Sequence, residues 1–168
     1  MNVECRRKRE CLVPGRKLPI LALLLLVWTT AAACKDMALI SHKSNAMTSV
    51  AMPDLVKICK GQTNRWPDGK PVTFVMRDPG SPDMRLILEK VYNMSKSEVI
   101  AAIAVANHGR MNHPAIIVVD SDDALLDKVE STPGAVGLVD VYSITGGVQV
   151  IRLGGKLPLE AGYPLHGN

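Results

Sequence analysis

Five consecutive residues, Arg77 to Ser81, combine side chains and backbone flexibility suited to binding a small anion. They join an apolar run to the first turn of a helical pattern, where unpaired N–H groups and the helix dipole attract negative charge. The Arg77 guanidinium presents a planar fork of donors that fits phosphate or carboxylate. Gly80 lets the backbone turn tightly, and the Ser81 hydroxyl can cap the helix or reach a bound oxygen. We treat this junction as the candidate site, although a strand, a turn and a Ser-capped helix also occur together for purely structural reasons.

Other reactive side chains give little support for a metal or catalytic site. His108 and His113 lie in a polar loop with no third ligand nearby in sequence, and the chain has no Cys-x-x-Cys pair. The acidic residues between positions 120 and 123 are explained by capping and by the dipole of a following helix, although they could bind a divalent cation. Ser81 lacks the glycines of a nucleophile turn, so an enzyme is the weakest alternative. We expect a protein that is not an enzyme and that uses no metal and no cofactor.

The charge distribution argues against nucleic-acid binding. The 168 residues carry a net charge of +4, but residues 1–33 hold six basic and two acidic residues, which account for that excess. The remainder is balanced, with 14 residues of each sign. Aromatic residues make up only 4% of the chain, which leaves little surface for stacking bases. The sequence therefore predicts a globular domain with no nucleic-acid partner.

Residues 1–33 have the pattern of an export signal. A basic segment precedes an apolar run from Leu18 to Trp28, and Ala31 and Ala33 supply the small side chains that a signal peptidase requires. A run of about 11 residues is too short to span a bilayer, although a membrane anchor is the alternative if it continues through Ala33. Cys34 follows directly, as in a bacterial lipoprotein signal, but Ala31 stands where those signals usually have leucine. We expect export to the periplasm or cell envelope, with lipidation of Cys34 left open.

Export would leave two cysteines in the mature chain, Cys34 and Cys59. Cys59 lies in a short helical pattern that has proline in its first turn and ends at Gly61. We expect Cys59 to be buried and inert on the apolar face of that helix. A disulfide with Cys34 is the alternative, and lipidation of Cys34 would exclude it.

Strand and helix patterns alternate along the chain, which predicts an α/β fold with a three-layer mixed sheet flanked by helices. The run from Ala115 to Val119 is almost entirely apolar, as in a strand covered on both faces. We expect one domain over residues 34–153 and a loosely ordered, glycine-containing and proline-containing tail over 154–168. The expected strands are Met37 to His42, Val72 to Met76, Ala115 to Val119, Val136 to Val139 and Val148 to Leu153. The expected helices are a short run from Pro53 that ends just before Gly61, Pro82 to Tyr92, a run capped by Ser95 that ends near Ala106, and a run that is capped within Asp120 to Asp123 and extends through about Glu130.

Several segments together resemble the phosphate-binding proteins of ABC-type phosphate importers, which have the type 2 periplasmic-binding fold. The segments are Leu55 to Gly61, Trp66 to Gly69, Arg77 to Ser81 and Thr132 to Val139, in the order of that family. The resemblance covers about residues 37–153 and is closest to short members that keep one of the two lobes. It implies the fold of one lobe and a function in binding phosphate.

The resemblance implies that Arg77 and Ser81 contact the phosphate, with Gly80 and neighbouring backbone N–H groups completing the site. The family continues with glycine and threonine, whereas this chain has Pro82 and Asp83. Pro82 removes one donor. At an effective dielectric constant of about 20, a carboxylate 5 Å from phosphate costs roughly 3 kcal/mol, unless Asp83 points away. Asp83 is therefore expected to modulate binding.

Two hypotheses follow. The first is an exported, non-enzymatic binding protein for phosphate or another small oxyanion, which uses Arg77, Gly80 and Ser81. The second is an envelope protein-interaction module that keeps the fold and has lost the ligand, which Pro82 and Asp83 favour. The implied partners are the anion and a transporter, a sensor or a second-lobe protein, and membrane contact would come only through the leader or a lipid on Cys34.

Overall fold

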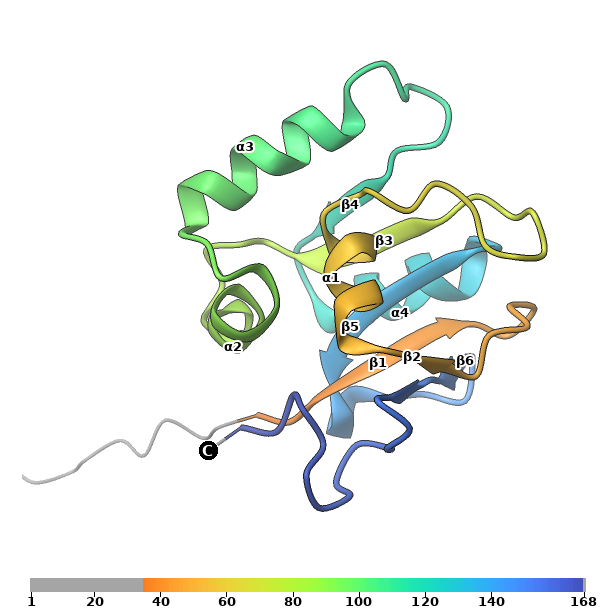
Figure 1. The fold of residues 1–168 in the computed structure, drawn as a ribbon, viewed down its shortest axis with the longest axis vertical. Coiled ribbons are helices and arrows are strands. Elements are labelled where there is room, and N and C mark those ends of the chain that lie inside the picture. The colour runs from red at the N-terminus through yellow and green to blue at the C-terminus, as the bar shows by residue number, and fades with distance from the viewer. Residues whose placement is uncertain (1–34, 168) are drawn as a thin grey trace, which may run out of the picture. The chain divides into compact units, whose positions relative to one another are not determined.

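Seven strands form the sheets of this protein in a computed structural model that describes residues 35–167 (Figure 1). The predicted signal peptide and Cys34 lie outside this range and stay predictions. The main sheet has the order β4-β3-β5-β1-β6, and β2 pairs with β7 in a two-stranded sheet. The strands are β1 (Met37–His42), β2 (Ser49–Val50), β3 (Thr73–Arg77), β4 (Ile116–Val119), β5 (Ala135–Asp140), β6 (Val148–Val150) and β7 (Arg152–Leu153).

The main sheet is mixed. Strand β3 runs parallel to β4 and β5, whereas β1 runs antiparallel to both β5 and β6. The carboxyl ends of β3, β4 and β5 therefore meet at one edge of the sheet, and their amino ends meet at the opposite edge. The helices are α1 (Met52–Cys59), α2 (Arg85–Ile87), α3 (Lys96–Asn107) and α4 (Asp122–Ser131).

Helices cover both faces of the sheet, so the predicted three-layer α/β architecture is confirmed (Figure 1). One apolar cluster joins α1 and the helical segment 82–92 to one face, where Phe74 and Leu138 are completely buried. A second cluster joins α4 to the other face, through side chains such as Leu125 and Val129. No helix within residues 35–167 is long and apolar enough to cross a membrane.

Local sequence signals explain several element boundaries. Strand β1 has the predicted bounds, and α3 begins with the predicted capping box, in which Ser95 Oγ accepts from the Glu98 N–H and the Glu98 carboxylate accepts from the Ser95 N–H. Cys59 is buried with a free thiol, as expected, and burial raises its pKa. The predicted helix over residues 82–92 is instead a 3-10 turn, a short α-helix and a π-helical turn, ending at Asn93 with φ +49°.

Two expectations are wrong. Strand β4 is not covered on both faces: it is the edge strand of the sheet, and the Val118 side chain is 41% exposed. The tail is not loosely ordered, because Tyr163 and Leu165 are buried in the core and the Met37 N–H donates to the Leu165 carbonyl. The described part of the tail, residues 154–167, contains no helix, yet the buried side chains of Tyr163 and Leu165 anchor it beside β1. Its glycines indicated an irregular backbone, which says nothing about packing.

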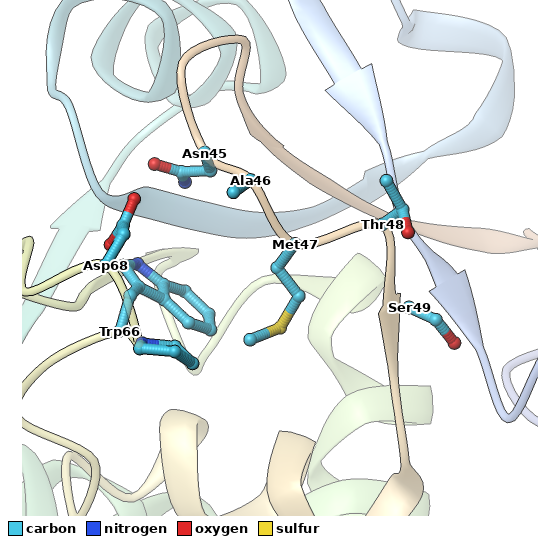
Figure 2. Close-up of a pocket in the computed structure, with 8 residues that line it drawn as sticks. Asn45, Ala46, Met47, Thr48, Ser49, Trp66 and Asp68 are labelled. Carbon is cyan, nitrogen blue, oxygen red and sulfur yellow. The ribbon is translucent and has the colours of Figure 1, made fainter.

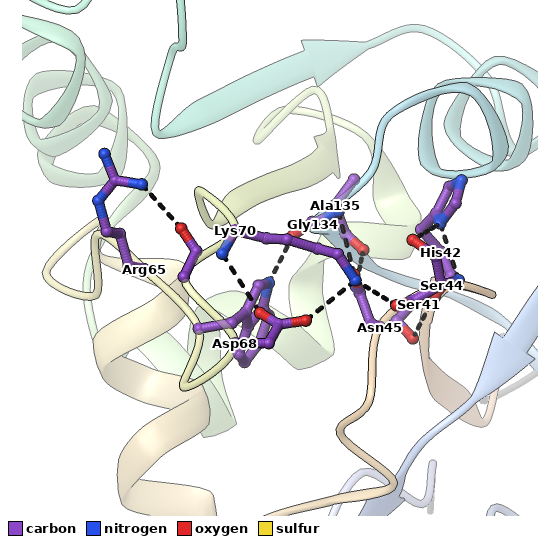
Figure 3. Close-up of polar contacts among 11 residues, drawn as sticks. Ser41, His42, Ser44, Asn45, Arg65, Asp68, Lys70, Gly134 and Ala135 are labelled. Atoms are coloured by element: carbon purple, nitrogen blue, oxygen red, sulfur yellow. Dashed lines mark hydrogen bonds and ion pairs between the residues drawn. The ribbon is translucent and has the colours of Figure 1, made fainter.

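A buried asparagine joins two loops at the amino edge of the sheet. Asn45 Nδ2 donates to the Ala135 carbonyl at 3.1 Å, and Asn45 Oδ1 accepts from the Gly134 N–H at 3.0 Å (Figure 3). The Trp66 indole N–H donates to the Gly134 carbonyl at 2.8 Å. These bonds position the loop after β1 and the predicted turn at Trp66, which Gly69 allows with φ +83°.

Asn45→Ala should lower the free energy of unfolding by about 2–4 kcal/mol, because it leaves a buried N–H and a buried carbonyl without partners. Urea denaturation measures this change. The control is Ser44→Ala, which removes an exposed hydroxyl bonded to His42 and should change stability by less than about 0.5 kcal/mol. Equal losses in the two variants would contradict the structural role assigned to Asn45.

Candidate functional site

Arg77 is the last residue of β3 and lies at the carboxyl edge of the sheet. Because β3, β4 and β5 are parallel, residues that follow each of these strands gather near it. Asp122 begins α4 after β4, and Asp140 ends β5. In open α/β sheets ligands bind at this edge, so the topology favours the site that the sequence predicted. We call Lys35, Arg77, Asp83, Asp122 and Asp140 the Arg77 cluster.

Two carboxylates pair with the Arg77 guanidinium. Its Nη1 lies 2.5 Å from Asp122 Oδ1 and 3.6 Å from Asp83 Oδ2. Asp122 Oδ2 also accepts from the Ser143 hydroxyl at 3.1 Å. The Arg77 side chain is only 16% exposed, so these pairs are shielded from most of the solvent. Asp83 therefore turns toward Arg77 rather than away from it.

Lys35 links the remaining carboxylates. Its ammonium lies 3.1 Å from Asp83 Oδ1 and 3.5 Å from Asp140 Oδ2. The hydrogen bond to Asp83 raises the pKa of Lys35 above its ordinary value, so this side chain stays positively charged at neutral pH. The Arg77 cluster then holds two cations and three carboxylates, which gives it a formal charge of −1.

The turn at Gly80 uses its own backbone donors. The Gly80 N–H donates to Asp78 Oδ1 at 2.5 Å, and the Ser81 N–H donates to the Asp78 carbonyl at 2.9 Å. Neither N–H is free for a ligand in this arrangement. The ammonium of Lys96, at the start of α3, lies directly over Gly80 and adds a positive charge that the sequence did not indicate.

Two buried polar atoms at this site lack partners within residues 35–167. They are Arg77 Nε and Ser81 Oγ, from the two residues that the sequence assigned to the ligand. The Ser81 side chain makes no capping bond to the following helical turn, although it was expected to be able to cap it. A buried polar group without a hydrogen-bond partner costs about 1–3 kcal/mol of stability, so a ligand oxygen that accepts a hydrogen bond from either atom would remove this cost.

Two cavities lie away from this site. One, of about 360 Å³, is lined by residues 45–49 and by Trp66, Pro67 and Asp68 (Figure 2). Figure 2 shows the Met47 and Trp66 side chains at this cavity. The other is lined by segments that precede β3 and β4. Neither of these two cavities is lined by Arg77, Gly80 or Ser81.

Three of the polar side chains beside the Trp66 cavity, those of Asn45, Trp66 and Asp68, are already paired. Asn45 and the Trp66 indole bond to the segment before β5, as described above, and Asp68 pairs with Lys70 at 2.9 Å (Figure 3). The hydrogen bond from Lys70 lowers the pKa of Asp68. These polar side chains therefore have structural roles and do not indicate a ligand site. Within residues 35–167 no group of three or more His, Cys, Asp or Glu side chains is arranged to hold a metal ion.

The sequence proposed the central residues of the candidate site but not their partners. Arg77, Gly80 and Ser81 were proposed to bind the anion, and Asp83 was expected to modulate them. Asp122 was interpreted as a helix cap, and Lys35 was assigned no role. A signal was available, because Asp122 and Asp140 both follow predicted strands, and parallel strands of one sheet end on the same side.

Comparisons with known proteins identify the fold. No protein-family model and no curated protein matches this chain. Among solved structures, an ABC-type phosphate transport receptor from Vibrio cholerae aligns with a TM-score of 0.64 and 18% identity, over 79% of this chain and 54% of that one. PstS from Borrelia burgdorferi aligns with a TM-score of 0.61 and 18% identity, over 80% of this chain and 55% of that one. A third match is a putative phosphate ABC transporter substrate-binding protein with bound phosphate from Clostridium perfringens. It aligns with a TM-score of 0.57 and 20% identity, over 72% of this chain and 46% of that one.

These alignments confirm the predicted resemblance at the level of the fold. The chain spans about half the length of the solved structures that it matches. Identities of 20% or less carry no residue roles, so the function of the Arg77 cluster is argued below from its own geometry.

Asp122→Asn should lower the free energy of unfolding by about 1–2 kcal/mol, because it removes one of the two charges paired with the shielded Arg77 guanidinium. Urea denaturation at neutral pH measures this loss. Asp123→Asn is the matched control, because Asp123 is the next residue of α4, is exposed and pairs with no basic side chain within residues 35–167. If both variants lose the same stability, the effect comes from the helix dipole and not from the ion pair.

Proposed function

We propose that this chain is a non-enzymatic binding protein for phosphate or another small oxyanion, and that the anion binds at the Arg77 cluster. One observation carries the proposal: within residues 35–167, Arg77 Nε and Ser81 Oγ are buried without partners near the carboxyl ends of the parallel strands β3, β4 and β5. The fold shared with phosphate-transport receptors supports it. An oxyanion would accept a hydrogen bond from each of these atoms, and Lys96 over Gly80 would add a positive charge.

The carboxylates decide which anion fits. Asp83 and Asp122 hold two oxygens against the Arg77 guanidinium, so a fully deprotonated anion meets repulsion there. Hydrogen phosphate carries a proton that it can donate to a carboxylate, whereas sulfate at neutral pH has none. The site should therefore prefer phosphate to sulfate. Its affinity should be modest, because the formal charge of the cluster is already −1 without a ligand.

A second candidate function is a protein-interaction module on the same fold. Helix α3 favours it, because this helix is apolar on nearly all sides and only Val99 is buried. Its Ile100 and Val105 side chains are 49% and 77% exposed. A surface helix of this composition is unusual unless another surface covers it. A second-lobe protein, a transporter or a sensor in the cell envelope is the partner that this function implies.

The proposed location is the periplasm or the cell envelope. The pattern of residues 1–33 supports export, and Cys34 is the proposed position of a lipid if the leader is a lipoprotein signal. The ligand site and the apolar face of α3 would then both lie outside the cytoplasmic membrane.

Calorimetric titration of the full-length chain, kept soluble with a nonionic detergent, tests the phosphate site. Phosphate should bind and sulfate should bind at least about tenfold more weakly. Asp83→Asn should tighten phosphate binding about tenfold, because it removes one charge that pairs with Arg77. Arg77→Gln should abolish binding, and Ser81→Ala should weaken it.

Asp54→Asn is the control for Asp83→Asn, because Asp54 forms only an exposed ion pair with Lys57 on α1. It should leave phosphate affinity unchanged. If neither the unchanged chain nor Asp83→Asn binds phosphate at millimolar concentration, the oxyanion function is wrong and the interaction module becomes the better account of the fold.

A further inference from the structure

A basic groove lies at the end of the sheet opposite the Arg77 cluster. Its volume is about 590 Å³, within the usual range for small-molecule sites of roughly 300–1,000 Å³. Two stretches that lead into β3 form one side, and a loop that leads into β4 forms the other. These segments precede β3 and β4, whereas Arg77 is the last residue of β3 and Asp122 follows β4, so the groove is separate from the Arg77 cluster. Its lining residues are Asn64, Arg65, Pro71, Val72, Gly109, Arg110, Met111, Asn112 and His113.

The groove carries positive charge without a balancing carboxylate. Arg65 and Arg110 both line it, and none of its lining residues is acidic. Within residues 35–167 neither arginine forms an ion pair, whereas Arg77 pairs with two carboxylates. Two guanidinium groups on one groove repel each other, and an anion between them would remove that repulsion.

Neutral acceptors orient both arginines. Arg65 Nη1 donates to the Gly69 carbonyl at 2.7 Å (Figure 3), and Arg110 Nη2 donates to Asn64 Oδ1 at 2.5 Å. Each bond fixes part of a guanidinium without neutralising its charge. A guanidinium has five N–H donors, so most of them remain for a ligand. Both groups are thus held in place and are still able to bind an anion.

The groove also has apolar walls. Val72 is almost fully buried beneath it, Pro71 is partly buried, and Met111 is 96% exposed at its rim. Bare phosphate would leave this apolar surface uncovered and fill only a small part of the volume. An ester would place its phosphate group on the arginines and its organic part on Pro71 and Met111. A phosphate monoester also carries close to two negative charges at neutral pH, which matches two arginines.

We propose that the basic groove is a binding site for a phosphate ester, with Arg65 and Arg110 as its anion-binding residues. The site is independent of the Arg77 cluster, so it does not depend on the function proposed above. The phosphate group can belong to a free monoester, which carries close to two negative charges, or to the diester head group of an anionic lipid, which carries one. Both present phosphoryl oxygens that guanidinium groups recognise.

Amide chemical shifts of the full-length chain, measured while phenyl phosphate is added, test this proposal. Signals of residues 64–65 and 109–113 should move with one dissociation constant. Arg65→Gln and Arg110→Gln should each weaken binding about tenfold, and the double variant more strongly. Titration with glycerophosphoglycerol, a soluble lipid head group, distinguishes the sources: tighter binding than phenyl phosphate assigns the site to lipid, and weaker binding assigns it to a free monoester.

A control variant separates this site from others. Arg85→Gln removes an exposed arginine that does not line the groove, and it should leave phenyl phosphate affinity unchanged. Shifts confined to residues 77–83, equal weakening in Arg85→Gln, or no shifts at millimolar phenyl phosphate would each overturn the proposal. Failure of phosphate to bind at Arg77 would leave it standing.

Discussion

The pairing of Arg77 with Asp122 is the interaction on which the carboxyl edge of the sheet depends. It connects the end of β3 to the first residue of α4, the helix that covers one face of the sheet. Asp83 and Lys35 then extend the pair into a cluster that reaches Asp140 at the end of β5. Each charge in this chain of contacts has an opposite charge beside it. The carboxylates that fix the Arg77 side chain also use its hydrogen-bond donors. They therefore stabilise this part of the fold and at the same time lower its affinity for an anion.

The sequence predicted the parts of this fold that short-range chemistry determines. Strand β1 was placed correctly because Met37 to Ile40 form a short apolar run that is followed by the polar residues Ser41 and His42. The start of α3 was placed correctly because Ser95 and Glu98 have the spacing of a capping box. The exposed edge of β4 could not be predicted, because an apolar strand looks the same in sequence whether it lies inside a sheet or at its edge. Likewise, Tyr163 and Leu165 are anchored by distant core residues.

The candidate site was predicted to a similar extent. Arg77 and Ser81 are only four residues apart, so a local motif was enough to propose them as site residues. Asp122 lies 45 residues after Arg77, and Lys35 lies 42 residues before it, so only the strand order brings them together. Whether Asp83 points toward Arg77 depends on Lys35, which bonds its other oxygen. The electrostatic balance of the site therefore depends on three-dimensional contacts that no local pattern contains.

The two ends of the sheet differ in how their arginines are held, and this difference has a consequence for affinity. Carboxylates hold Arg77, so an anion must replace or share favourable ion pairs before it gains anything. Neutral oxygens hold Arg65 and Arg110, so an anion there gains the full attraction of two charges, reduced only by their exposure to water. On this reasoning the basic groove offers the stronger electrostatic attraction for an anion, whereas the Arg77 cluster offers the more shielded donors.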